Sequence, residues 1–143
     1  MKNVPTKWWI IGAAVLIVGL LGGSKFLQSS DPNVVSRSGL HWHPTLAIYV
    51  KGEKQEIPAN IGIGAMHQPM HTHVEDAAAG IIHLEFAGVV KREALMLGQF
   101  FMNWGKEFDS FGTNVKMAVN GQENTEFENY VMQEEDKIEL RYE

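Results

Sequence analysis

The longest apolar stretch of the chain lies near its amino end. The residues from Trp8 to Leu27 are nearly all apolar or glycine, with Ser24 and Lys25 as exceptions. Because a helix rises about 1.5 Å per residue, this stretch is long enough to cross the hydrocarbon core of a bilayer. A cleaved signal peptide is the alternative, but Leu21-Gly22-Gly23-Ser24 is a poor cleavage site. We therefore expect an uncleaved transmembrane anchor over residues 1–27.

The flanking charges predict how this anchor is oriented. Lys2, Lys7 and the terminal amino group precede the apolar stretch, whereas Lys25 lies near its other end. Positive charge favours the cytoplasmic side, so the rest of the chain is expected outside the cytoplasm. Residues 28–33 are rich in Ser, Asp, Pro and Asn, which is typical of a linker. An extracytoplasmic domain is then expected over residues 34–143.

Beyond the linker, β-branched and aromatic residues in short alternating runs predict strands. Residues 46–50 and 55–58 predict a hairpin. The alternation over residues 81–86 predicts a strand with one apolar face toward the core, and with His83 and Glu85 together on the other face. The stretch between these elements, rich in glycine, methionine and histidine, is expected to be a loop.

A helical period of apolar residues occurs once in the domain. Over residues 95–105, large apolar side chains recur every three or four positions and predict a helix with a buried stripe. Two further strands are expected over residues 114–119 and 137–142. The predicted fold class is α+β, with an N-terminal transmembrane helix followed by a small, mostly β domain with one helix.

The composition excludes some classes of function. The chain has 12 basic and 17 acidic residues, a net charge of -5, and no cysteine. An acidic surface repels phosphate, so nucleic acid is not expected as a partner. The absence of cysteine excludes thiolate chemistry, including blue-copper sites. A hydrophobic content of 45% is enough for a modest core.

The histidines predict a metal site, because all six lie between His41 and His83. Residues two apart in an extended segment point the same way, so each of the two His-x-His pairs can turn both rings toward one ion. Glu85, two residues after His83, can serve as a ligand or accept a hydrogen bond from an imidazole N–H. The candidate ligands are His41, His43, His67, Met70, His71, His73, His83 and Glu85.

Copper is the metal expected first. Imidazole suits copper, zinc and nickel, and a Met thioether biases a site toward copper. Zinc or another divalent transition metal is the alternative. Met70 and His67 are the weaker candidates, since Met more often fills gaps in a core and His67 belongs to the expected loop. Taken singly, a strand histidine such as His83 is more often a hydrogen-bonded residue than a ligand, so the prediction depends on the whole cluster.

Two resemblances add expectations. Val119-Asn120-Gly121 and the segment from Glu135 to Leu140 resemble part of a β-grasp, or ubiquitin-like, fold in the C-terminal half. The whole outer region is similar to a group of uncharacterised, membrane-anchored bacterial and archaeal domains that share five short elements. In this chain they lie at His41 to His43, Ile57 to Gly62, His71 to His73, Ile81 to His83 and Phe100 to Gly105. That resemblance implies an architecture and a candidate metal site, with no established activity.

Together these features predict a membrane-tethered protein that captures, delivers or stores copper outside the cytoplasm. A cupin-like metalloenzyme is one alternative, in which Glu75, Asp76 or Glu85 would transfer protons. Its motif is poorly matched, because Glu75 follows His73 by only two positions. A second alternative is a metal-free accessory subunit of a membrane protein complex, in which the histidines pack or form hydrogen bonds.

Overall fold

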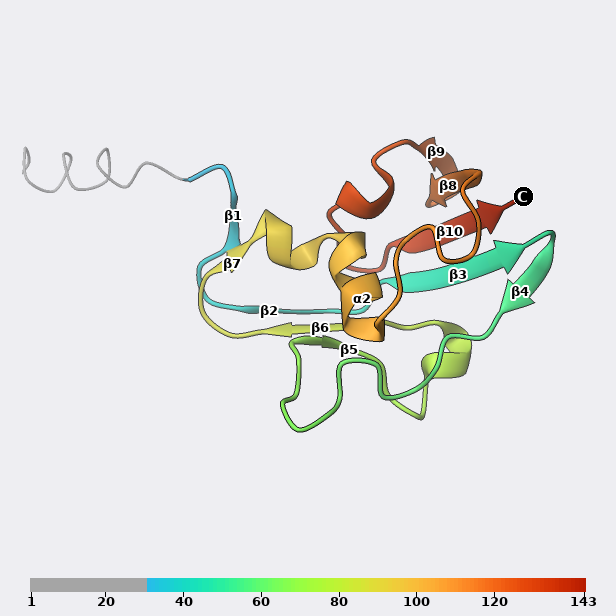
Figure 1. Cartoon of the computed structure of the whole chain (residues 1–143). Coiled ribbons are helices and arrows are strands. Elements are labelled where there is room, and N and C mark those ends of the chain that lie inside the picture. The colour runs from blue at the N-terminus through green and yellow to red at the C-terminus, as the bar shows by residue number, and fades with distance from the viewer. Residues whose placement is uncertain (1–30) are drawn as a thin grey trace, which may run out of the picture. The chain divides into compact units, whose positions relative to one another are not determined.

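A five-stranded sheet forms the centre of the domain (Figure 1). The computed structural model describes residues 31–143, and Asn33–Glu143 make up one unit. The strand order in this sheet is β4-β3-β10-β8-β9. Its strands are β3 (Thr45–Val50), β4 (Glu53–Gln55), β8 (Val115–Val119), β9 (Gln122–Asn124) and β10 (Lys137–Tyr142). The hairpin and the two late strands expected from the sequence are confirmed, but the second strand of the hairpin was misplaced: it was expected over residues 55–58, and β4 begins at Glu53 and ends at Gln55.

The two central strands, β3 and β10, run parallel to each other. Leu46 lies opposite Ile138 and Ile48 opposite Leu140, and all four side chains are buried. Because side chains alternate across a strand, these residues share one face of the sheet, which forms the core. A parallel pair requires a long crossover connection. In this domain the crossover carries most of the histidines and the helix.

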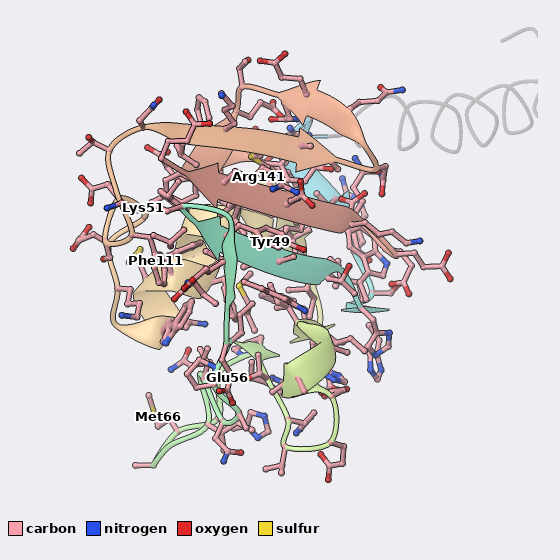
Figure 2. All side chains as sticks on the ribbon, turned by 90° about the vertical axis from the view of Figure 1, so that its right-hand side faces the viewer. Tyr49, Lys51, Glu56, Met66, Phe111 and Arg141 are labelled. Atoms are coloured by element: carbon pink, nitrogen blue, oxygen red, sulfur yellow. The ribbon has the colours of Figure 1, made fainter. Side chains whose placement is uncertain are left out.

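The face of the sheet opposite the core is more exposed. In Figure 2, Arg141 and Tyr49 lie together on this face, on the neighbouring strands β10 and β3. The guanidinium carbon of Arg141 lies 4.5 Å from the centre of the Tyr49 ring. Such a cation–π contact stabilises the pair by about 0.5–1 kcal/mol at an exposed site.

The helix α2 (Leu97–Trp104) contributes to the hydrophobic core on the buried face of the sheet. Its buried residues Leu97, Phe100 and Phe101 belong to the same hydrophobic cluster as the strand residues. The helix ends where Gly105 adopts the left-handed conformation and donates its N–H to Met102. The helix expected over residues 95–105 is therefore confirmed, although Arg92–Leu95 form the separate 3₁₀ turn η2.

A second, three-stranded sheet has the order β2-β6-β5. Its strands are β2 (Leu40–Trp42), β5 (Met70–His71) and β6 (His83–Phe86). Figure 1 shows it beside the lower end of β3. Backbone hydrogen bonds join the two sheets: the N–H of Leu46 donates to Gly80 at 2.8 Å, and the N–H of Ile82 donates to Pro44 at 2.9 Å. The histidine-rich sheet is thus fixed to the main core.

Short elements complete the described part of the chain. The strands β1 (Val34–Ser36) and β7 (Val90–Lys91) pair with each other. Two further 3₁₀ turns, η1 (Ala77–Ala79) and η3 (Phe127–Asn129), precede β6 and β10. None of these elements presents a long apolar face.

The predicted α+β class is wrong. The described residues form a mostly β structure with one α-helix of 8 residues. The helical period is confined to this segment, since Gly105 ends it and the other helical segments are single 3₁₀ turns. The residues that resemble a β-grasp lie in the C-terminal half, and β3 and β4 from the N-terminal half complete the sheet.

The predicted transmembrane helix falls on residues that the structure does not describe. Within residues 31–143, no helix is long and apolar enough to cross a membrane. The anchor expected over residues 1–27, and most of the linker expected over residues 28–33, lie outside the described residues.

Candidate metal centre

The small sheet brings histidines from three strands onto one face. His71 on β5 lies opposite His83 on β6, and His41 on β2 lies opposite Glu85 on β6. Residues directly opposite on neighbouring strands point the same way, and so do residues two apart on one strand. All four side chains therefore share this face. The segment around His71, expected to be a loop, is a strand because β6 provides its hydrogen-bonding partner.

His43 and His73 extend the cluster beyond the ends of β2 and β5. The ring centre of His83 lies 4.5 Å from that of His73 and 4.9 Å from that of His43. His83 thus lies between the two His-x-His pairs. The centres of His71 and His73 are 4.7 Å apart, as are those of His41 and His43. Both i, i+2 pairs therefore converge as the spacing predicts.

Hydrogen bonds determine which ring nitrogen of His71 is free to bind an ion. Nδ1 of His71 lies 2.9 Å from the carbonyl oxygen of Gln68, so Nδ1 carries the proton and donates it. Nε2 of the neutral ring is then an acceptor, and it faces Nε2 of His73 at 3.1 Å. Burial, and after it the charges of His67 and His73, lowers the pKa of His71, whose ring is 1% exposed. Its Nε2 lone pair is therefore available at neutral pH.

In His83 the other ring nitrogen, Nε2, carries the proton. Its Nε2 lies 2.8 Å from Oδ2 of Asp76 and donates a proton to that carboxylate. Nδ1 of His83 is buried and has no hydrogen-bond partner among the described residues. The nearest acidic atom is Oε1 of Glu85, at 3.7 Å, which is too far for a hydrogen bond. A buried nitrogen without a partner is costly, and a bound ion would satisfy it.

Two groups of ligand atoms result. Atoms of His71, His73, His83 and Glu85 all lie within 4.8 Å of one another, and so do atoms of His41, His43 and His83. The five histidines and the glutamate are thus brought together, but as two overlapping groups instead of one. His83 belongs to both groups.

The two weaker candidates belong to neither of these groups. Met70 is 1% exposed and points into the hydrophobic core, because it lies next to His71 on a strand and faces the other way. The ring of His67 lies 4.3 Å from that of His71, but His67 is exposed in a loop and belongs to neither group. In Figure 2, the same loop carries Met66 away from the domain, and Met66 is 76% exposed.

The sequence did not identify two residues at the site. Glu134 lies in the turn before β10, and its Oε1 is 3.6 Å from Nδ1 of His43. Its Oε2 also accepts the backbone N–H of His43 at 3.3 Å. The backbone of Gln68 fixes the tautomer of His71. Neither residue has a motif that marks it, because Glu134 approaches His43 only through the parallel pairing of β3 and β10.

Comparisons with models of known protein families, with curated proteins and with solved structures find no match to this chain. The resemblance to membrane-anchored, histidine-rich domains therefore stays a prediction from the sequence. A functional assignment must rest on the geometry of the residues themselves.

Proposed function

We propose that the protein binds a divalent transition metal ion through His71, His73, His83 and Glu85. The observation that carries this proposal is the unpartnered Nδ1 of His83, which is buried at the centre of the cluster. Asp76 holds the opposite nitrogen of the same ring at 2.8 Å. A carboxylate that accepts the second N–H of an imidazole orients the ring and makes it a better ligand.

The charge of the surroundings supports the same conclusion. Oδ1 of Asp76 is also buried without a hydrogen-bond partner among the described residues. A carboxylate oxygen that is shielded from water and has no partner is costly, and positive charge nearby reduces that cost. An ion bound to His83 would place positive charge on the far side of the imidazole ring from Asp76. Glu85 would bind the same ion directly and add a second negative charge beside it.

Copper is the preferred ion in this proposal. The site offers three imidazole nitrogens and one carboxylate oxygen. Mixed nitrogen and oxygen ligands suit Cu(II), which also binds more tightly than Zn(II) and Ni(II) to a given set of such ligands. Zinc is the alternative ion, since it accepts the same ligands in a tetrahedral arrangement.

The distribution of burial favours binding and exchange over catalysis. His71 is buried, His73 and His83 are half-buried, and Glu85 is exposed. An ion would therefore be held from the core side and remain accessible from solvent, as capture and delivery require. Four protein ligands also fill a tetrahedral site, whereas catalytic zinc sites keep one position open. The location outside the cytoplasm stays a prediction from the sequence.

The test is metal titration of the full chain, expressed without a histidine tag and stripped of metal. We expect at least one tightly bound Cu(II) per chain, with nitrogen ligands visible in the electron paramagnetic resonance spectrum. His73→Ala is expected to remove this ion. Glu75→Gln changes an exposed carboxylate close by and serves as the control. Failure to bind stoichiometric copper or zinc, or binding that His73→Ala leaves unchanged, would overturn the proposal. Tighter binding of zinc than of copper would overturn the preference for copper.

A further inference from the structure

We infer that the cluster is a dinuclear centre, in which His41 and His43 hold a second metal ion and Glu85 bridges the two ions. This inference rests on the proposed function, because it assumes a first ion on His71, His73 and His83. It assigns His41 and His43 to a separate site and makes Glu85 a ligand of both ions.

The candidate ligand atoms do not form a single group, which argues for more than one ion. His83 is common to both groups, and only its Nδ1 is free, because Nε2 donates to Asp76 at 2.8 Å. One lone pair binds one ion. The four-atom group that contains the deeply buried His71 already supplies a full set of ligands for that ion. His83 is then unavailable to the second group, so a second ion at His41 and His43 needs another third ligand.

Glu85 lies where its carboxylate can bridge two ions. Its Oε1 lies 3.2 Å from Nε2 of His41 and 3.7 Å from Nδ1 of His83. This oxygen therefore lies between His41, which would bind the second ion, and His83, which would bind the first. A carboxylate has two oxygens with several lone pairs and can bind two ions at once, which an imidazole with one free nitrogen cannot. Bridged ions in two-metal sites are about 3.5–4 Å apart, a separation that a single carboxylate spans.

His43 has an acidic neighbour of its own, Glu134. Oε1 of Glu134 lies 3.6 Å from Nδ1 of His43, and Oε2 accepts the backbone N–H of the same residue. Glu134 thus lies on the Nδ1 side of the His43 ring, although farther away than a hydrogen bond, and leaves Nε2 open to an ion. Glu134 also adds negative charge beside a second cation.

The second site differs from the first in exposure. The side chain of His41 is 61% exposed and that of His43 is 41% exposed. Ligands that move freely in solvent lose more entropy on binding than ligands that are already fixed. The ion at His41 and His43 is therefore the weaker one, and the faster to exchange.

The experiment counts the ions and measures their separation. The full chain without a tag is titrated with Cu(II), and bound copper is compared with the integrated paramagnetic resonance signal. We expect two equivalents, the second one weaker. The signal per copper falls as the second ion binds, because two Cu(II) ions that share a carboxylate couple magnetically.

Three variants make the result decisive. The double variant His41→Ala and His43→Ala is expected to bind one ion and to show no magnetic coupling. Glu85→Gln removes the bridge and is expected to abolish the magnetic coupling, whereas the control Glu75→Gln retains it. Circular dichroism checks that each variant is folded.

The outcomes separate this inference from the proposed function. If the native chain binds one ion that is lost in His73→Ala but kept in the His41 and His43 double variant, the dinuclear centre is wrong and the proposed function stands. If two ions bind without magnetic coupling, the bridge by Glu85 is wrong. If no stoichiometric ion binds, the proposed function and the inference both fail.

Discussion

His71 and His73 present their Nε2 atoms to each other at a distance of 3.1 Å. Since Nδ1 of His71 donates to the carbonyl of Gln68, the facing nitrogens share the single proton on Nε2 of His73. A second proton between them would make the buried ring of His71 positive and would point two N–H groups at each other. The pair is therefore arranged to be neutral, and acid is expected to oppose both its stability and its use as a ligand pair.

The metal-free protein is expected to become less stable as the pH falls below about 6.5. In the unfolded chain His71 titrates near the ordinary value of 6.5, while burial lowers its pKa in the folded protein. Between these two values the unfolded state binds more protons, so acid stabilises the unfolded state. Urea unfolding in the presence of a chelator, at several pH values from 8 to 5, measures this loss.

His71→Gln is the matched variant for this measurement, because glutamine does not titrate. Its unfolding free energy should depend less on pH over the same interval than that of the native chain. Equal pH dependence in the two proteins would contradict the role assigned to His71.

Asp76→Asn is expected to weaken binding of the first ion by about 10–100-fold, the range typical when the hydrogen-bond partner of a metal ligand is changed. The amide oxygen still accepts the proton of His83 but carries no negative charge, so the ring becomes a poorer ligand. Competition with a chelator of known affinity measures the change. Glu75→Gln, next to it in the chain, is the control, and an equal effect of both substitutions would argue against a specific role for Asp76.

Gly62→Ala is expected to disturb the site through β5, the strand that carries His71. Gly62 has φ +74, and a Cβ on it would collide with the carbonyl oxygen of Met70 and press on Cβ of His71 at 3.3 Å. We expect a loss of about 1–3 kcal/mol in unfolding free energy from the backbone strain and the collision. Copper affinity should fall as well, because β5 must shift and carries His71 with it.

Gly64→Ala is the control for this substitution. It lies two residues further along the same loop, and nothing lies within 4 Å of the added Cβ. Urea unfolding and copper titration of both variants should show an effect for Gly62→Ala alone. Similar losses in the two variants would indicate a general sensitivity of the loop.

Tyr142→Phe is expected to reduce the loss of stability in alkali. Burial, with added repulsion from Asp109 and Glu128, raises the pKa of Tyr142 above its ordinary value of 10.0. Above that pH the unfolded chain releases the phenol proton while the folded protein keeps it, so stability is complete below about pH 10 and falls as the pH rises. The variant lacks this contribution.

At neutral pH the same substitution should cost about 0.5–1.5 kcal/mol, the typical contribution of one hydrogen bond. The Tyr142 hydroxyl donates to the carbonyl oxygen of Phe108 at 2.6 Å, and phenylalanine cannot replace that bond. Thermal or urea unfolding at pH 7 and above pH 10 measures both effects. A steeper alkaline loss in the variant than in the native chain would contradict the assignment.

Local pattern was sufficient for the four longer strands, β3, β6, β8 and β10, and for the helix. Alternation along residues 137–142 and the helical period around Phe100 and Phe101 correspond to β10 and α2. These patterns are reliable because each element buries one of its own faces, and the period of apolar residues follows from that geometry. The short strand β5 was not predictable, since two residues contain no period and form a strand only beside β6.

For the candidate site, the sequence by itself determined which chemistry is present. Two His-x-His pairs, His83 and Glu85 follow from residue identity and spacing, because side chains two apart on an extended chain share a direction. Tertiary structure alone decided how these residues are divided. The pairing of β6 with both β2 and β5 places Glu85 beside His41 and His83 beside His71, and the turn before β10 brings Glu134 to His43. Such contacts depend on strand pairing between distant segments, whereas spacing along the chain reports only on neighbours.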